Sequence, residues 1–357
     1  MVSTSKRQTG SKRAAPPKPL HEELGLDKDT LLDMYYTMVL ARELDLRMWQ
    51  LNRQGKAAFV ISCQGQEAAQ VGLAFGLERG KDWVVPYYRD LALMLALGQT
   101  PRMVMLSLFA RAEEPNSGGR QMPAHYSFRR SHVFTTGSPV GTQFPHGVGL
   151  GLANKLLRQN AEVVAVTGGE GSTSQGDWHV SMNFAGIHKL PVLFVIENNN
   201  YAISVPLPLQ VGGQHLEARA EGYGMPGVSV DGSNPLECYR AVRDAAARAR
   251  AGEGPTLIEM RCIRMTAHSS DDNDRTYRTK EDKEADRQRE PIAFFQHYLT
   301  EHGILDEETD QTLRKRISAE VNDATDYAEQ APEPRAEDLL QHVYATPEEV
   351  AAWRSKL

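Results

Sequence analysis

Val163-Val164-Ala165-Val166-Thr167-Gly168-Gly169-Glu170-Gly171-Ser172 and Leu193-Phe194-Val195-Ile196-Glu197-Asn198-Asn199-Asn200-Tyr201 are the two stretches that decide the fold. Each begins as an apolar, β-branched run and ends in small or polar residues. This pattern is typical of a buried parallel strand whose carboxyl end opens into a site, where ligands of open α/β sheets bind. One stretch supplies a carboxylate and the other an amide. Such hard oxygen donors favour Mg²⁺, which also binds water and substrate phosphate.

The glycines near these strands match two nucleotide-binding motifs only in part. Residues 171–177 have Walker-loop spacing as far as the second glycine, but Asp177 and Trp178 stand where Lys and Ser or Thr are required. Gly149-Leu150-Gly151 resembles part of a dinucleotide fingerprint, but it precedes a strand instead of following one. We therefore expect these glycines to serve packing.

An acidic residue beside a polyphosphate repels it unless a cation lies between them. Glu170 therefore favours phosphate binding bridged by a metal over a lysine clamp. The alternative for either stretch alone is an ordinary turn rich in Gly, Glu and Asn. Two such stretches, each at the end of a strand, favour the metal site.

The segment from Gly169-Glu170-Gly171 to Asn198-Asn199 resembles the thiamine-diphosphate motif, in which an acid between glycines is followed by an Asn pair. The surrounding sequence, from about residue 30 to the C-terminus, resembles the α subunit of the E1 component of 2-oxo acid dehydrogenase complexes. The segment from Gly119 to Tyr126 is more similar to the branched-chain form than to the pyruvate form. The other matching segments, in family order, are Tyr88-Arg89-Asp90, Ser138-Pro139, Thr142-Gln143, Tyr201-Ala202-Ile203-Ser204 and His268-Ser269-Ser270.

This resemblance implies an α subunit of an α2β2 branched-chain 2-oxo acid dehydrogenase. Such an enzyme uses thiamine diphosphate to decarboxylate a small 2-oxo acid oxidatively, and it passes the acyl group to a lipoyl domain of the E2 acyltransferase. The resemblance places the site between subunits, with the E1 β subunit supplying the glutamate that starts ylid formation. Two alternatives are a pyruvate or acetoin dehydrogenase E1 α subunit and a non-catalytic scaffold of the same fold.

The resemblance also implies roles for individual residues. The implied Mg²⁺ ligands are Glu170, Asn199 and the backbone carbonyl of Tyr201. The implied cofactor contacts are Tyr88, Arg89, Ser138, Val140, Gly169, Gly171, Ser172 and His268. A structural K⁺ site is implied at Gly137, Pro139, Thr142 and Gln143, and the implied active-site histidines are His125 and His268.

Most of these roles have a structural alternative. Asn199 could cap a turn, and Arg89 could pair with Asp90 on the surface. Residues 137–143 could form an ordinary turn that contains proline. His268 could be one exposed residue of a charged segment.

Two residues depart from the family pattern. Glu197 stands where some relatives carry a basic residue near the phosphate, and Ala267 replaces a second histidine of some branched-chain relatives. Ser269 matches a position that is phosphorylated in animal forms, but no feature of the sequence shows that a kinase acts here.

The composition is that of a globular protein of 357 residues, with 41% hydrophobic and 24% charged residues. The net charge is −6, and residues 1–20 carry five basic residues and no acid, which leaves about −11 for the remainder. Such a body predicts no nucleic-acid binding. No apolar run reaches the roughly 18–20 residues of a membrane span, so we expect no membrane insertion.

Cys63, Cys238 and Cys262 are scattered and lack metal spacing, as expected for reduced thiols of an intracellular protein. The basic tail has no apolar core like that of a secretory signal. We therefore expect a disordered arm over residues 1–20 of a cytoplasmic protein.

The chain from residue 21 to 357 predicts a single α/β domain: a parallel sheet with helices on both faces, in the thiamine-diphosphate-binding fold, with a helical C-terminal extension. We expect a mobile charged loop over 264–280 and helices over 291–357 that pack on the domain or a partner. Gly147, Gly149, Gly151 and Ala153 predict that the helix at 147–158 faces another subunit. The other expected helices are 27–55, 64–77, 91–97, 101–110, 177–188 and 235–250, and the expected strands are 163–167, 192–196, 228–230 and 256–260.

Overall fold

The computed structural model describes residues 18–158, 161–213, 215–341 and 343–355. Of the predicted disordered tail, residues 1–17 lie outside these ranges.

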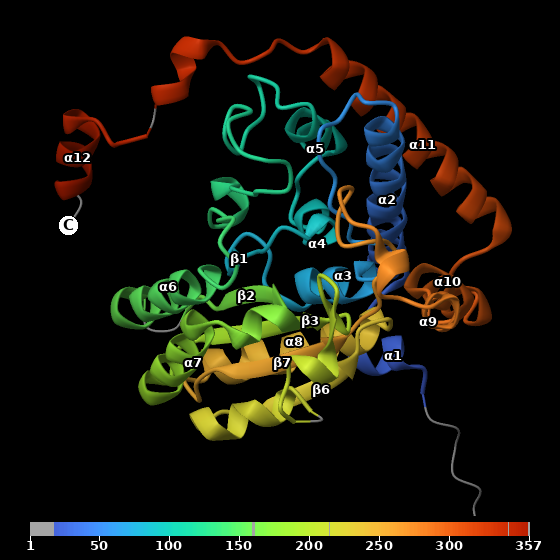
Figure 1. The fold of residues 1–357 in the computed structure, drawn as a ribbon. Coiled ribbons are helices and arrows are strands. Elements are labelled where there is room, and N and C mark those ends of the chain that lie inside the picture. Colours follow the sequence, from blue (N-terminus) through green and yellow to red (C-terminus); the bar gives the residue numbers. More distant parts are fainter. Residues whose placement is uncertain (1–17, 159–160, 214, 342, 356–357) are drawn as a thin grey trace, which may run out of the picture.

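A five-stranded parallel sheet forms the centre of the molecule, with the strand order β1-β2-β3-β7-β6 (Figure 1). Ala165 of β2 lies opposite Leu193 of β3, and Val195 of β3 lies opposite Ile258 of β7. The sheet confirms the predicted fold class. The strands are β1 (Trp83–Val85), β2 (Val164–Gly169), β3 (Val192–Asn198), β6 (Gly227–Asp231) and β7 (Thr256–Arg261).

Helices cover both faces of this sheet, which explains why its central strands are apolar at nearly every position. Ala165 and Leu193 pack toward α3 (Glu67–Gly76) and α8 (Pro235–Arg250). Their neighbours Val164 and Phe194 point the other way, toward α6 (Gln143–Arg158) and α7 (Gly176–His188). Alternate residues of one strand therefore fill two different cores.

A helical layer carries a third core beside the sheet. Ile317, Val321 and Ala324 of α11 are buried in this core, where α11 packs along α2 and α5. The expectation that the C-terminal helices pack on the domain is confirmed for α10 and α11. The helices of this layer are α2 (Lys28–Arg53), α4 (Leu91–Ala96), α5 (Pro101–Leu108), α10 (Pro291–Glu301) and α11 (Glu307–Gln330).

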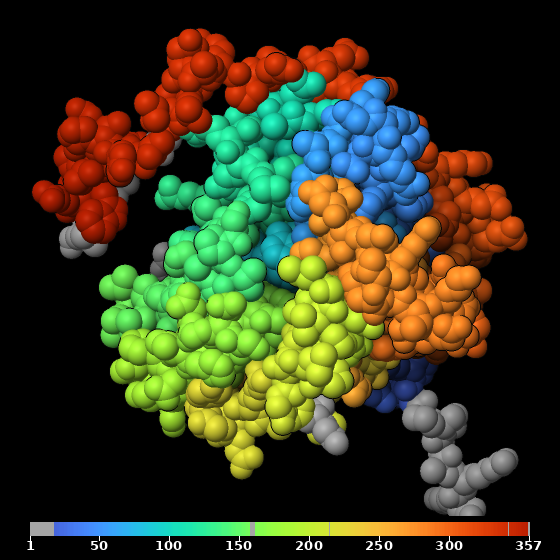
Figure 2. Space-filling model, viewed as in Figure 1, coloured from blue at the N-terminus to red at the C-terminus, as the bar shows by residue number. Residues whose placement is uncertain are grey.

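The last helix, α12 (Pro347–Arg354), lies apart from the body at the end of an extended segment (Figures 1 and 2). The remaining elements are short: α1 (Leu20–Leu24), α9 (Lys280–Arg287), and the hairpin strands β4 (Tyr201–Ala202) and β5 (Val205–Pro206).

Helix α6 differs from its prediction in two ways. It begins at Gln143 and includes Pro145 in its first turn, where the missing N–H costs nothing. An added Cβ at Gly147 would lie 1.9 Å from the side chain of Val166, and one at Gly151 would lie 2.4 Å from Val192. Gly147 and Gly151 therefore allow α6 to approach its own sheet, whereas the prediction that this helix faces another subunit stays a prediction. Gly149 alone of the three has open space around its Cβ position.

The charged segment 264–290 is more ordered in its contacts than its composition predicts. It contains α9, which Thr279 and Asp282 begin with a reciprocal capping box. Arg264, Ser269, Asp274 and Arg278 are buried. Arg264 donates to the carbonyls of Tyr201 and Ile203, and Arg278 donates to the carbonyl of Arg264 and the carboxylate of Asp286.

None of the helices in the described ranges is both long and apolar enough to span a bilayer. Cys63, Cys238 and Cys262 are buried and free.

Candidate active site

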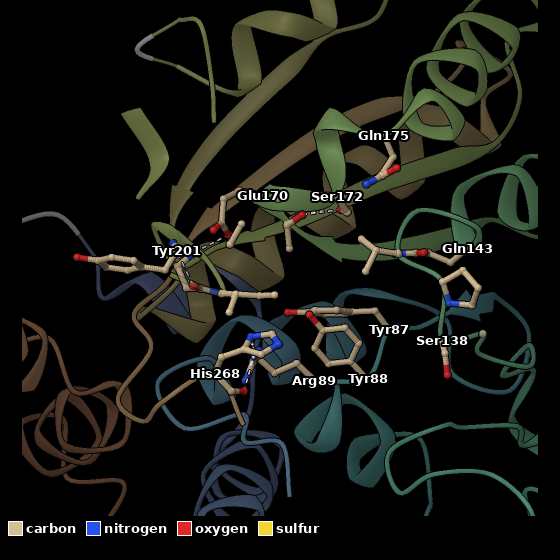
Figure 3. A pocket seen from close by; sticks show the side chains of 18 residues that line it. Tyr87, Tyr88, Arg89, Ser138, Gln143, Glu170, Ser172, Gln175, Tyr201 and His268 are labelled. Carbon is tan, nitrogen blue, oxygen red and sulfur yellow. Dashed lines mark hydrogen bonds between the residues drawn. The ribbon is translucent and has the colours of Figure 1, made fainter. Parts of the chain in front are cut away.

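Four neighbouring strands end at one pocket of about 270 Å³ (Figure 3). Because β1, β2, β3 and β7 are parallel, the residues that follow them meet at the same edge of the sheet. Arg89 follows β1, Glu170 follows β2, Asn199 follows β3, and His268 follows β7. The lining residues are Tyr87, Tyr88, Arg89, Gly137, Ser138, Pro139, Val140, Gln143, Gly169, Glu170, Gly171, Ser172, Gln175, Asn199, Tyr201, Ala202, Ile203 and His268.

Glu170 is the acidic residue of this lining, and it is 1% exposed. Its Oε2 accepts a hydrogen bond of 3.2 Å from the backbone N–H of Asn199. Its Oε1 is buried without a hydrogen-bond partner among the described residues. Burial raises the pKa of this carboxyl group, because a charge without solvent or a counter-ion is unfavourable. An unpartnered buried carboxylate oxygen is the donor that a bound cation would satisfy.

Asn199 and Tyr201 lie on the turn after β3, and Asn199 is hydrogen-bonded to Glu170. The Asn199 Oδ1 accepts from the backbone N–H of Tyr201 at 3.3 Å, so the predicted turn cap is present as well. The same side chain lines the pocket beside Glu170. The ring of Tyr201 points away from the other labelled side chains (Figure 3), and its backbone carbonyl accepts a hydrogen bond of 3.3 Å from Arg264. Carboxylate, amide and carbonyl oxygens together suit a Mg²⁺ ion.

Arg89 forms the opposite, basic side of the pocket and is 2% exposed. One of its amino groups donates to the carbonyl of Ser62, and the other lies 3.3 Å from both the carbonyl and the Nδ1 of His268. Asp90 is occupied elsewhere, since it accepts from the backbone N–H of Tyr87 and from the hydroxyl of Thr167. The alternative of an exposed Arg89–Asp90 pair is therefore wrong.

Two further guanidinium groups strengthen the positive field. Arg264 donates to the carbonyl of Ile203 at 2.7 Å and to the hydroxyl of Tyr277 at 2.9 Å. Burial and the neighbouring charges of Arg89 and Arg278 lower the pKa of Arg264. Like charges gathered in a buried place favour the binding of an anion, which neutralises them. Tyr88, which is half-buried beside Arg89, adds a phenol hydroxyl.

The backbone at Gly171 approaches the hairpin β4–β5 closely. A Cβ at this position would lie 2.6 Å from the Cβ of Ala202, so a larger residue would displace the pocket wall. The hydroxyl of the next residue, Ser172, donates to the carbonyl of Gly169. Because the hydroxyl hydrogen of Ser172 is donated to Gly169, this side chain can offer a ligand only its oxygen as an acceptor.

His268 lies at the mouth of the pocket facing Arg89 and Tyr88 (Figure 3). Its backbone N–H donates to the Asp272 carboxylate at 2.8 Å, which fixes its position. Burial and the positive charges of Arg89 and Arg264 lower its pKa to about 4. The ring is therefore neutral near pH 7. Because Nδ1 faces a guanidinium donor, the proton belongs on Nε2, which can donate a hydrogen bond. The alternative of an unattached, exposed histidine is wrong.

His125 does not line the pocket, but it contacts a residue that does. Its Nε2 lies 2.5 Å from the hydroxyl of Ser138, and its Nδ1 lies 3.2 Å from the carbonyl of Pro123. The preceding residue, Ala124, has φ 64°, a strained value for a non-glycine residue. The loop therefore holds His125 at the rim, one residue away from the pocket.

The predicted K⁺ segment lines the pocket through Gly137, Pro139 and Gln143, whereas Thr142 does not. The Thr142 hydroxyl donates to the carbonyl of Pro139 at 2.9 Å, and the Gln143 Oε1 accepts from the N–H of Gly141 at 3.0 Å. The predicted turn is thus present, and it occupies several of the oxygens that a cation would need.

Tyr87, Gln175, Ala202 and Ile203 line the pocket but were not among the predicted site residues. Ala202 and Ile203 belong to a segment that matched the family, and Ile203 has φ 54°, which is an outlier for a β-branched residue and typical of functional sites. Gln175 precedes α7 and carries no motif signal.

Glu197 does not line the pocket. It is fully buried, and it accepts hydrogen bonds from Gln70 and Tyr87 at 3.0 and 3.1 Å. Glu197 stands where some relatives carry a basic residue, but its carboxylate does not enter the pocket lining.

Comparison with known proteins identifies the family. Residues 35–337 match the family described as "Dehydrogenase E1 component". The 2-oxoisovalerate dehydrogenase subunit alpha of Bacillus subtilis is 54% identical over 91% of this chain and 98% of its own length. The 3-methyl-2-oxobutanoate dehydrogenase subunit alpha of Mycobacterium tuberculosis H37Rv is 36% identical over 90% of this chain and 84% of its own. The pyruvate dehydrogenase E1 component subunit alpha of Acholeplasma laidlawii is 36% identical over 90% of each chain. The chain therefore belongs to the dehydrogenase E1 component family, among the alpha subunits of the branched-chain 2-oxo acid type.

Proposed function

We propose that this chain is the α subunit of a thiamine-diphosphate-dependent dehydrogenase that decarboxylates branched-chain 2-oxo acids and transfers the acyl group to a lipoyl domain of E2. One observation carries the proposal. The ends of four parallel strands bring the buried carboxylate of Glu170 and the buried guanidinium of Arg89 to one pocket, as a metal-bridged diphosphate requires. The 54% identity to a 2-oxoisovalerate dehydrogenase subunit supports the substrate class.

The residues of the pocket fit the cofactor that the family implies. Glu170, Asn199 and the carbonyl of Tyr201 would hold Mg²⁺, while Arg89 and Tyr88 would bind the diphosphate oxygens. The bound thiamine diphosphate supplies a carbanion nucleophile and an electron sink. The residues of this chain would hold the cofactor in place and exclude water from the pocket, and His268 would serve as the proton donor.

His268 suits the role of a neutral donor. With its pKa lowered to about 4, its Nε2–H can donate to an oxygen of the substrate without placing a cation in the free site. Binding of an anionic diphosphate to Arg89 would remove part of the charge that lowers this pKa, so the imidazole would become more basic in the loaded enzyme. His125 would act on the same space through Ser138.

A K⁺ ion at Gly137, Pro139, Thr142 and Gln143 has weaker support than Mg²⁺. The oxygens of Pro139 and Gln143 already accept hydrogen bonds within the turn, so a cation would have to share them.

A second subunit is required by the proposed chemistry. Among the residues that line the pocket, the acidic one is Glu170, and metal binding would occupy it. The acid–base group that activates the aminopyrimidine must therefore come from another chain, as in an α2β2 assembly. Large apolar side chains exposed on α6 and α7 support a subunit contact; they are Leu156, Leu157, Val180, Phe184 and Ile187.

The substrate is tested by assembling the chain with its E1 β partner and measuring kcat/KM for 3-methyl-2-oxobutanoate and for pyruvate. A pocket built for a branched side chain should favour the former by about tenfold or more, the usual gain for added apolar groups. A preference for pyruvate would support the pyruvate dehydrogenase alternative instead. Absence of cofactor binding and of decarboxylation in the assembled pair would support the scaffold alternative.

A further inference from the structure

A buried carboxyl group, that of Glu259, binds the side chain of Asn198, the residue before Asn199. Glu259 is in the middle of β7, 4% exposed, and does not line the pocket. Its Oε1 accepts a hydrogen bond of 2.6 Å from the side-chain Nδ2 of Asn198. Its Oε2 accepts one of 3.1 Å from the hydroxyl of Ser229 on the neighbouring strand β6. The function described so far uses neither Glu259 nor Asn198.

These contacts determine which way the Asn198 amide faces. The backbone N–H of Asn200 can only donate, so it binds the amide oxygen of Asn198, while the amino end of the amide donates to the Oε1 of Glu259. That oxygen, Oδ1, accepts a hydrogen bond of 3.0 Å from the backbone N–H of Asn200. If the amide were reversed, two acceptors would face each other at Glu259 and two donors at Asn200.

The Asn198 amide thus stabilises a turn that needs support. Asn200 has φ 69°, a left-handed conformation that costs energy unless local hydrogen bonds favour it. The residues on either side of Asn200 are Asn199 and Tyr201, which line the pocket together with Glu170. Asn198 itself is buried at 3% exposure and does not line the pocket, so it can act there only through its neighbours.

A second acid, Glu217, lies near Glu259 and is partly buried. Burial and the nearby carboxyl group of Glu217, the first residue of the short helical segment Glu217–Tyr223, raise the pKa of Glu259. The Oε2 of Glu217 is buried without a partner among the described residues. A buried carboxyl group with a second carboxyl group close to it is unfavourable for stability. A position selected only for stability would more readily hold a neutral amide.

We propose that Glu259 and Asn198 are a positioning pair, in which Glu259 orients the Asn198 amide so that it caps Asn200 and presets Asn199 and the Tyr201 carbonyl for Mg²⁺. The proposal rests on the proposed function, since it concerns the same metal site. It assigns the first asparagine of the Asn198-Asn199 pair a role in shaping the turn, not in binding the ion.

The test uses the assembled α/β protein with Glu259→Leu, Glu259→Gln and Ser229→Ala. Mg²⁺ affinity is measured by calorimetry at saturating thiamine diphosphate, and exchange of the Asn200 amide hydrogen is measured without cofactor. We expect Glu259→Leu to weaken Mg²⁺ binding by about tenfold, or about 1.4 kcal/mol, and to speed exchange at Asn200. Glu259→Gln should stay within about twofold of the wild type, because its carbonyl still accepts from Asn198. Ser229→Ala, the matched control, removes the other hydrogen bond of Glu259 and should leave both measurements unchanged.

Equal Mg²⁺ affinity and equal Asn200 exchange in Glu259→Leu and the wild type would overturn the proposal. So would an equal loss in Glu259→Leu and Ser229→Ala, which would indicate general loosening of the sheet. If Glu259→Leu does not assemble, Asn198→Ala replaces it, and unchanged Mg²⁺ affinity in that variant would be decisive against the pair. Wild-type protein that binds no Mg²⁺ and cofactor would refute the proposed function instead, so the two failures are distinct.

Discussion

Glu170 and Arg89 are single residues whose burial lowers the stability of the fold unless a ligand is bound in the pocket. Each is buried, and neither forms an ion pair with the other in the described contacts. A carboxylate oxygen without a partner and a guanidinium bound only to carbonyl and imidazole groups are both unfavourable unless a ligand completes them. Charged groups held this way are typical of functional sites. A metal ion bound to a phosphate would give both side chains a partner, since the metal binds the carboxylate and the phosphate binds the guanidinium.

His268 is the residue whose replacement should separate chemistry from binding. His268→Ala removes the proton donor but leaves Arg89 and the Mg²⁺ ligands in place, so the affinity for thiamine diphosphate should change little. Transfer of the acyl group to a lipoyl domain should slow by about 100-fold or more, the usual contribution of a general acid. The measurement is single-turnover transfer with saturating cofactor and the β subunit present.

The matched control for this variant is His215→Ala, because His215 is largely exposed and outside the pocket. It should transfer the acyl group at the wild-type rate. Normal transfer in His268→Ala would end the assignment of His268 to catalysis, whereas loss of cofactor affinity would make it a binding residue.

At the scale of elements, the segment 264–280 is attached by a few buried residues and exposed between them. Arg264 and Arg278 anchor it, and Arg278 binds the carbonyl of Arg264 and the carboxylate of Asp286. Arg275 and Thr276 are exposed. The predicted mobility of this loop stays a prediction, and it now applies to the exposed part between two anchored ends.

Cofactor binding should therefore protect this loop from trypsin. Thiamine diphosphate with Mg²⁺ would neutralise the basic cluster around Arg89 and Arg264 and hold the loop in place, so cleavage after Arg275 should slow several-fold in the assembled protein. Cleavage after Arg130, which is exposed and outside the pocket, provides the internal control and should not change. Equal cleavage after Arg275 with and without cofactor would show that the loop is already closed.

Elements with a clear pattern of apolar residues could be predicted from the sequence. Elements whose formation depends on tertiary contacts could not. Strands β2 and β3 were evident because burial on both faces makes them continuously apolar. Strand β1 has three residues, which is too few to show a pattern, although it positions Arg89. Helix α9 has no apolar face, and its capping box at Thr279 was the available signal.

The same distinction applies to the pocket. Motifs located Glu170, Asn199, Arg89 and His268, which the structure brings together at four strand ends. Gln175 could not be predicted, because it reaches the pocket only through the path of the chain between β2 and α7. The buried state of Arg264 and Arg278 was also hidden, since their partners are backbone carbonyls that no sequence pattern reveals.

At the scale of the whole molecule, many of the most exposed large apolar side chains lie on two parts of the chain. They occur on α6 and α7 and on the C-terminal segment, where Leu340, Tyr344 and Trp353 are largely exposed. Large exposed apolar side chains on a stable protein indicate contacts with other chains. This surface and the missing second acid of the pocket both support the proposed assembly with a β subunit.

The most direct test of the account is a calorimetric titration of thiamine diphosphate into the assembled α/β protein, with Mg²⁺ and with a chelator. We expect binding that requires Mg²⁺, and we expect Glu170→Gln to weaken it by about 10- to 100-fold, the scale of losing one charged partner. The control Glu221→Gln changes an exposed acid outside the pocket and should bind as the wild type does. Equal affinity with the chelator, or in Glu170→Gln, would contradict a metal-bridged diphosphate at the ends of β2 and β3.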